Sequence, residues 1–355
     1  MQKDHVEVTV DVIIPARNEE DCIGRCLQSL VAQQGISLQI TVVDDGSTDS
    51  TRAIAESFPG VRVLTAGELK PGMTGKVNAL VTGAKGSTAE WLLFTDADTY
   101  HYPGSLVASV QEAEDHKVDL FSYSPEQETA AWWELAVMPL VFADLVRTYS
   151  SERINDPADP TVAANGQYIL VRREVYEALG GHSVLPLNVL EDIELAKIFK
   201  VSGNRIWFGY GAGRVRTRMY RTFSAMWEGW SKGLAILFRR PVLLAAKRGL
   251  EFVAIAFLLT LGLVMMARSH FGSAAVFFSI GVLFYLIFLF RICQAHFPLK
   301  ANLMAFIGLP IYVSLLLRSD LHFNRRGELT WKGRTYAQSA PKAADDSSTR
   351  KVDLS

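Results

Sequence analysis

The feature that most constrains the fold is a repeated alternation, in the first third of the chain, of short apolar runs with segments of helical periodicity. The apolar runs are residues 8–15, 39–43, 61–64 and 91–95. The segments with helical spacing are residues 23–31, 49–58, 76–84 and 103–116. Near-continuous apolar strands that alternate with helices are typical of a parallel sheet with helices on both faces. The sequence therefore predicts an α/β fold with a doubly wound, mostly parallel sheet.

Polar clusters follow three of these predicted strands. They occupy residues 16–19, 44–47 and 96–98. Ligands of open α/β sheets bind at the carboxyl ends of the strands. We therefore expect the three clusters to converge on one edge of the sheet and to form a binding site there.

The last of these clusters contains two aspartates, Asp96 and Asp98, directly after a buried strand. Carboxylate oxygens are the ligands that hard divalent cations prefer. Mg²⁺ or Mn²⁺ held there would neutralise the phosphates of a departing nucleoside diphosphate. Solvated turns carry the same pattern, so the pair alone does not define a site.

A second acidic pair, Asp44 and Asp45, also ends a predicted strand. Such side chains accept hydrogen bonds from a base or ribose, and Gly46 permits a close approach of the backbone. Helix capping accounts for Ser47 and Asp49. It does not account for the adjacent aspartates, which favours a binding role for them.

Four motifs, at residues 15–19, 43–49, 75–80 and 95–98, occur in an order that resembles the family 2 glycosyltransferases of the GT-A fold. Residues 180–181 and 190–195 are similar to further elements of that family. The resemblance covers residues 10 to 336. It implies a GT-A nucleotide-diphospho-sugar transferase fold, a nucleotide-sugar donor and transfer with inversion at the anomeric carbon.

The resemblance also implies roles for individual residues. Asp192 would be the general base that takes the acceptor proton, and Asp96 and Asp98 would hold the metal. The expected donor-binding residues are Pro15, Asn18, Glu19, Asp44, Asp45, Lys76 and Asp96. For Glu191 and Asp192 the alternative is a structural role at a helix N-terminus, where the dipole favours acids.

Processive members of the family carry a Gln-x-x-Arg-Trp element after the base, and this sequence has none. In its place are Arg216, Arg218, Trp230 and Lys232. We assign these side chains, together with Glu191, to the acceptor or diphosphate side of the site. A basic, aromatic interfacial helix touching lipid headgroups is the alternative. The departure favours transfer of one sugar over polymer synthesis.

The C-terminal third contains long apolar stretches. Residues 252–267 and 271–290 carry no charge and would span about 24 and 30 Å as helices. The second is long enough to cross a bilayer, and the first crosses with help from flanking residues. Residues 303–317, with Pro310 in the middle, would form a third span or a re-entrant or interfacial helix.

These features predict five regions. A GT-A catalytic domain covers residues 1–220, an interfacial amphipathic region 221–248, and membrane helices 249–318. A cytoplasmic juxtamembrane segment covers 319–336, and a disordered tail 337–355. Residues 328–334 resemble a segment of lipid-modifying family members, including those acting on carotenoid and hopanoid lipids.

The predicted function is transfer of a single sugar from a nucleotide-diphospho-sugar, UDP-hexose in the simplest case, to a membrane lipid. We expect a multi-pass protein of the cell membrane with a cytoplasmic catalytic domain; its three cysteines would stay reduced there. The 36 basic and 37 acidic residues give a net charge of -1, which argues against nucleic acid as a partner. A processive polysaccharide synthase, a sugar-phosphate nucleotidyltransferase and an inactive membrane-bound binding module are the alternatives.

Overall fold

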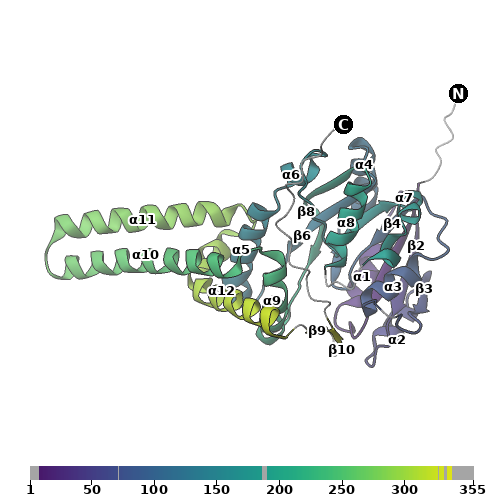
Figure 1. The fold of residues 1–355 in the computed structure, drawn as a ribbon, viewed down its shortest axis with the longest axis horizontal. Coiled ribbons are helices and arrows are strands. Elements are labelled where there is room, and N and C mark those ends of the chain that lie inside the picture. Colours follow the sequence, from purple (N-terminus) through teal and green to yellow (C-terminus); the bar gives the residue numbers. More distant parts are fainter. Residues whose placement is uncertain (1–7, 71, 186–189, 327, 332–333, 338–355) are drawn as a thin grey trace, which may run out of the picture.

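The computed structural model describes residues 8–70, 72–185, 190–326, 328–331 and 334–337. An α/β body contains the sheet, and a long helical hairpin extends away from it (Figure 1). A layer of helices lies between the two (Figure 1). The predicted disordered tail falls almost entirely on residues 338–355, outside the described residues.

The described strands of the body form one eight-stranded sheet in the order β3-β2-β1-β4-β7-β6-β8-β5. The strands are β1 (Thr9–Ala16), β2 (Ser37–Asp44), β3 (Val61–Thr65), β4 (Trp91–Phe94), β5 (Thr99–His101), β6 (Leu120–Gln127), β7 (Ile169–Arg172) and β8 (Ile206–Thr217). The first four in this order run parallel. Strand β7 is antiparallel to both of its neighbours, and β5 is antiparallel to β8. The sheet is mixed and mostly parallel, as in the predicted fold class.

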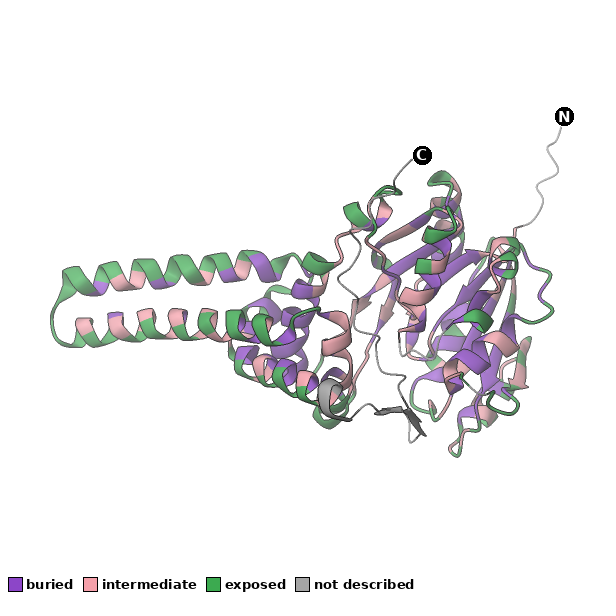
Figure 2. Ribbon diagram, viewed as in Figure 1, coloured by how far each residue is buried: buried purple, intermediate pink, exposed green. Residues whose placement is uncertain are grey.

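Helices cover both faces of this sheet. One face packs on α1 (Ile23–Val31), α2 (Thr51–Glu56) and α4 (Ser105–Asp115). The other packs on α3 (Gly75–Ala84), α7 (Arg173–Ala178) and α8 (Glu191–Val201). Figure 2 shows the buried residues concentrated along the strands between these layers. Burial on both faces explains why the parallel strands are apolar along their whole length.

Strands β5, β6 and β8 were not among the predicted strands. Strand β8 contains Gly209, Gly211 and Gly213 and alternates polar with apolar residues only in part. Strand β6 includes Pro125, next to a shift in its register with β8. Proline and glycine are depleted in strands. These segments become strands because distant partners pair with them.

A separate apolar core joins the body to the C-terminal helices. It contains α5 (Trp132–Thr148), α9 (Phe223–Leu237) and α12 (Leu299–Arg326), together with one end of the hairpin. Outside the hairpin, the remaining described elements are the short helices α6 (Ser151–Asn155) and η1 (Gly181–Val184) and the strand pair β9 (Glu328–Trp331) and β10 (Arg334–Ala337). Because α5 follows β6 directly, this core is continuous with the sheet.

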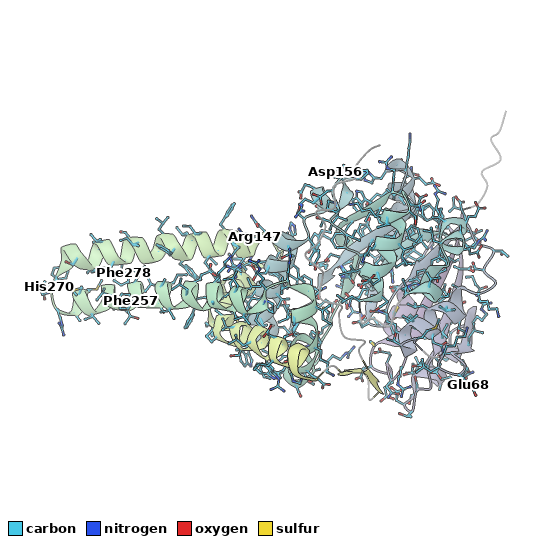
Figure 3. All side chains as sticks on the ribbon, viewed as in Figure 1. Glu68, Arg147, Asp156, Phe257, His270 and Phe278 are labelled. Carbon is cyan, nitrogen blue, oxygen red and sulfur yellow. The ribbon has the colours of Figure 1, made fainter. Side chains whose placement is uncertain are left out.

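The hairpin consists of α10 (Pro241–Ala267) and α11 (Phe271–Cys293). Phe257 and Phe290 are 62% and 72% exposed, so the hairpin presents apolar side chains outward. The two helices pack closely, since a Cβ at Gly262 would lie 2.9 Å from the ring of Phe278. Figure 3 places His270 at the tip, farthest from the body. This is the arrangement expected of a helix pair surrounded by lipid.

Three of the described helices, α10, α11 and α12, are long and apolar enough to cross a membrane. Helix α12 packs along α5 and α9 and is more buried than the other two. It is one continuous helix despite Pro310, without the reversal that a re-entrant segment requires. Whether α12 crosses a bilayer or lies at its surface stays a prediction.

Candidate active site

The carboxyl ends of β1, β2 and β4 border a cleft of about 970 Å³. Almost all of the residues predicted for the site line it. The donor-side residues in its wall are Pro15, Asn18, Glu19, Asp45, Lys76, Asp96 and Asp98, and the acceptor-side ones are Glu191, Asp192, Arg218, Trp230 and Lys232. Three sequence motifs separated by many residues therefore meet at one edge of the sheet.

The loops after β1 and β2 hold each other in place. The backbone N–H of Asn18 donates to Oγ of Ser47, and Oδ1 of Asn18 accepts from the backbone N–H of Thr48. Asn18 has a left-handed φ of 54°, which asparagine tolerates better than most residues. Asp44 accepts from the backbone N–H of Ser47 and does not line the cleft. Its observed role is to hold the turn.

Asp45 lies beside a basic side chain at the rim of this edge. Nη1 of Arg17 donates to the backbone carbonyl of Asp45 at 2.6 Å and lies 3.6 Å from its carboxylate. Both residues line the cleft. A cation and an anion are thus available together where a nucleotide would bind.

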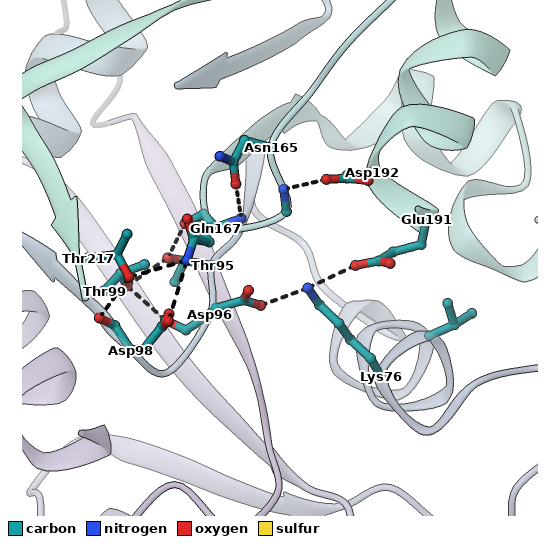
Figure 4. A network of polar contacts seen from close by, with 12 residues as sticks. Lys76, Thr95, Asp96, Asp98, Thr99, Asn165, Gln167, Glu191, Asp192 and Thr217 are labelled. Atoms are coloured by element: carbon teal, nitrogen blue, oxygen red, sulfur yellow. Dashed lines mark hydrogen bonds and ion pairs between the residues drawn. The ribbon is translucent and has the colours of Figure 1, made fainter. Parts of the chain in front are cut away.

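Lys76 connects the two acidic sides of the site. Thr74 caps the helix that carries it, and Nζ lies 2.8 Å from Oδ1 of Asp96 and 2.8 Å from Oε1 of Glu191 (Figure 4). Burial alone would lower the pKa of Lys76, but the charges of Asp96 and Glu191 outweigh it and raise that pKa. Lys76 therefore stays protonated and links β4 to α8.

Asp98 has the properties of a cation ligand. Its Oδ2 accepts a 3.4 Å hydrogen bond from Nε2 of Gln167, while the buried Oδ1 has no hydrogen-bond partner among the described residues. Removal from solvent, then the charges of Asp96 and Glu19, raise the pKa of Asp98 to about 7. A divalent cation would relieve this repulsion.

The described residues hold no group of three or more His, Cys, Asp and Glu side chains that could hold a metal, so a cation at Asp96 and Asp98 would need further ligands from the substrate. Mg²⁺ is commonly bound by one or two carboxylates together with substrate phosphates. Two carboxylates, one with an unsatisfied oxygen, fit such a cation. Two carboxylates are too few to hold a cation without ligands from the substrate or from water.

Asp192 occupies the first turn of α8. It accepts hydrogen bonds from the backbone N–H of Gly166, at 2.9 Å, and of Ile193. Burial, then the charge of Glu191, raise the pKa of Asp192 to about 7. Such a pKa suits a general base near neutral pH. The bond to Gly166 comes from the segment before β7, so the position at a helix N-terminus does not fully explain this residue.

Sequence reasoning missed the role of Gly166 and Gln167 in the site. A Cβ at Gly166 would lie 3.0 Å from Nζ of Lys76 and 3.3 Å from Oε1 of Glu191. A side chain at this position would force the ends of Lys76 and Glu191 to shift, so glycine favours the close approach of the three segments. A lone Gly-Gln pair in a loop carries no sequence signal for this role.

Two basic side chains at the end of β8, Arg216 and Arg218, reach different places. Arg218 lines the cleft and pairs with Glu134 at 2.9 Å. Arg216 does not line it; it pairs with Glu128 and stacks over the ring of Tyr100. Residues two positions apart in a strand share a face, but Arg218 lies just beyond the end of β8. Arg216 is held outside the cleft by Glu128 and Tyr100. Its assigned role stays a prediction without support from the cleft.

The mixed sheet, the acidic residues at its strand ends and the cleft beside them are the arrangement expected from the motifs that resemble GT-A glycosyltransferases. Residues 11–180 match the model of the family described as Glycosyl transferase family 2. The chain therefore contains a family 2 glycosyltransferase domain, as the motifs indicated.

Two known proteins resemble the chain over most of its length. A 4,4'-diaponeurosporenoate glycosyltransferase of Staphylococcus aureus (strain MRSA252) is 26% identical over 338 residues, which cover 92% of this chain and 88% of that protein. The structure of a mannosyltransferase from Pyrobaculum calidifontis, solved with GDP-Man and Mn²⁺, superimposes with a TM-score of 0.51 at 19% identity. It covers 90% of this chain and 87% of the mannosyltransferase. The second likeness establishes the fold.

Proposed function

We propose that the protein transfers a single sugar, with inversion, from a nucleotide-diphospho-sugar to a lipid of the membrane that its hairpin enters. The observation that carries this proposal is that Asp192 and the Asp96–Asp98 pair line one cleft, linked through Lys76 and Glu191. A base for the acceptor and a cation site for the leaving group are the two parts that direct displacement requires.

In the proposed reaction an oxygen of the acceptor attacks the anomeric carbon of the donor. The bond from that carbon to the diphosphate oxygen breaks, and the diphosphate keeps the electron pair. The acceptor proton passes to the free carboxylate of Asp192, which the backbone N–H groups of Gly166 and Ile193 hold in position. One displacement on the side opposite the leaving group inverts the configuration.

On the donor side, Asp96 and Asp98 would hold Mg²⁺ or Mn²⁺, which supplies charge neutralisation of the diphosphate. Arg17 and Asp45 are placed to bind the nucleotide part. Lys76 keeps the Asp96 side chain and the α8 acids at a fixed separation. A UDP-hexose is the simplest donor for such a site.

A lipid acceptor is supported by the apolar hairpin and by the relative named for a carotenoid acid, 4,4'-diaponeurosporenoate. In this proposal the catalytic domain faces the cytoplasm, where nucleotide sugars are made, and α10 and α11 cross the cell membrane. The regions proposed are those predicted from the sequence, with α9 at the membrane surface.

The test uses purified full-length protein in vesicles of extracted membrane lipids, supplied in turn with UDP- and GDP-sugars and with Mn²⁺, Mg²⁺ or EDTA. Mass analysis should find a lipid heavier by one sugar, and EDTA should abolish it. Asp192→Asn is the matched control, because it keeps the size of the side chain and removes the base. Products carrying several sugars, or no lipid product with any donor, would contradict the proposal.

A further inference from the structure

The active-site cleft extends beyond the carboxylates into a part with apolar walls. We call this part the apolar arm. Its walls are Phe142, Leu145 and Val146 of α5, Leu237 of α9, and Ala295 and Phe297 of the turn between α11 and α12. The donor-side motifs contribute none of these residues, so the arm has no evident use in binding a nucleotide sugar.

The apolar arm adjoins the base of the membrane hairpin from both sides. Leu237 ends α9 just before Pro241 begins α10, and Ala295 and Phe297 follow Cys293, where α11 ends. The two chain segments that lead into and out of the hairpin therefore line the same cleft as the catalytic carboxylates. Figure 1 shows this end of the hairpin against α5 and α9.

A row of aromatic rings connects the hairpin base with the metal side of the site. The ring centroids of Phe297 and Phe142 are 5.7 Å apart, those of Phe142 and Trp230 6.4 Å, and those of Trp230 and Tyr220 5.8 Å. All four residues line the cleft. Burial and the negative charge of Asp98 both raise the pKa of Tyr220, so the row ends near that carboxylate.

Tyr149 is a further residue of the cleft that contacts the apolar arm. Tyr149, at the end of α5, donates a 2.8 Å hydrogen bond to the backbone carbonyl of Leu237. Burial and the charge of Asp192 raise the pKa of Tyr149. Tyr149 thus contacts the apolar wall at Leu237 and lines the same cleft as Glu191 and Asp192.

We propose that the apolar arm binds the hydrocarbon chain of the acceptor, which enters from the bilayer beside the hairpin base and presents its hydroxyl or carboxyl end to Asp192. This inference rests on the proposed function and adds the route and the specificity determinants of the acceptor. Removal of an apolar chain from water favours its binding in proportion to the area buried. A chain that starts in lipid reaches the site without crossing water.

The test uses a C16 alcohol with a photoreactive group in its chain, added to phosphatidylcholine vesicles that contain the full-length protein. Peptides of α5 and of the α11–α12 turn should be labelled. Val146→Trp, at an exposed position of the arm (41% exposed), should reduce that labelling at least fivefold. The matched control is Val31→Trp on α1, at a comparable exposure of 48% and outside the cleft.

Donor binding, measured by calorimetry, should be the same in Val146→Trp and Val31→Trp. Unchanged donor binding shows that Val146→Trp is folded. Leu237→Trp serves as a second narrowing variant if Val146→Trp loses donor binding. Labelling confined to the outer faces of α10 and α11, or equal labelling and equal lipid glycosylation in wild type and Val146→Trp, would overturn the route through the arm. Absence of any glycosylated lipid from the wild type would instead contradict the proposed function.

Discussion

A charged cluster buried at the base of the hairpin provides the most quantitative prediction. Asp144 of α5 is 3% exposed and accepts hydrogen bonds from Arg248 of α10, Arg291 of α11 and Tyr312 of α12. Glu251 pairs with the same two arginines, at 3.2 and 2.7 Å. Two positive and two negative groups therefore balance where the catalytic body meets all three apolar helices.

Asp144→Asn removes one charge without creating a cavity. The variant leaves two guanidinium groups facing a single carboxylate, and it turns an amide N–H₂ toward donors. Breaking a buried ion pair by removing one partner costs about 3–5 kcal/mol, because an uncompensated charge stays buried. Because Glu251 remains as a partner for both arginines, we expect the free energy of unfolding to fall by about 3 kcal/mol, the lower end of this range.

Glu90→Gln is the matched control, since it also converts an acid to its amide. Glu90 pairs with Arg172 at 3.1 Å, but their side chains are 41% and 34% exposed. Exposed pairs contribute about 0–1 kcal/mol. The two variants therefore differ in burial and share their chemistry.

The free energy of unfolding is measured by equilibrium urea titration in detergent, followed by tryptophan fluorescence. Urea is preferred because a guanidinium salt would screen the charges under test. If Asp144→Asn lowers the free energy of unfolding no more than Glu90→Gln does, the charged cluster is hydrated or otherwise neutralised. Its role in holding the hairpin to the body is then refuted.

Four further predictions concern the site and the topology. Asp98→Ala should abolish Mn²⁺-dependent donor binding in calorimetry and leave the fold intact; unchanged affinity would remove this residue from the metal site. Asp192→Asn should bind the donor normally and lose about 10²–10⁴ in turnover, the range for general bases. Only the ionised form of Asp192 takes a proton, and its pKa is raised to about 7 by burial and Glu191 against the opposing charge of Lys76, with Tyr149 also nearby. Wild-type kcat/KM should therefore fall as the pH drops below about 7. A value of kcat/KM that does not change down to pH 5 would argue against this base. A reporter fused after Ser355 should stay cytoplasmic if α10 and α11 cross the membrane and α12 does not, as the basic residues that follow favour; a signal from the far side would mean that α12 crosses too.

The parallel half of the sheet and the donor side of the site could be predicted from the sequence. Strands β1 to β3 are short and largely apolar, and the next element after each is a helix that covers the sheet, while β4 is followed by the short strand β5 and then α4; for these strands the local pattern and the final structure agree. The side chains Asp45, Asp96 and Asp98 meet because parallel strands end at one edge. The hairpin was equally predictable, because residues 252–267 and 271–290 carry no charge.

The other half of the sheet could not be predicted in this way. Strand β8 pairs with β6 and β5, which precede it by many residues, and its glycines and arginines do not favour a strand by themselves. Long-range pairing decided their conformation, as it commonly does where local propensity is weak. Arg216 in this strand and Arg218 just after it consequently reach different surroundings.

The sequence by itself determined which residues are candidates for the chemistry and where the apolar hairpin lies, because strand ends and charge-free helices are local patterns. Only the tertiary structure decided what those residues touch. Lys76 bridges Asp96 and Glu191, Gly166 donates to Asp192, and Asp144 meets Arg248 and Arg291. Each contact joins segments far apart in the chain, and it forms because packing of the sheet, α5 and the hairpin buries charges that are stable there only in pairs.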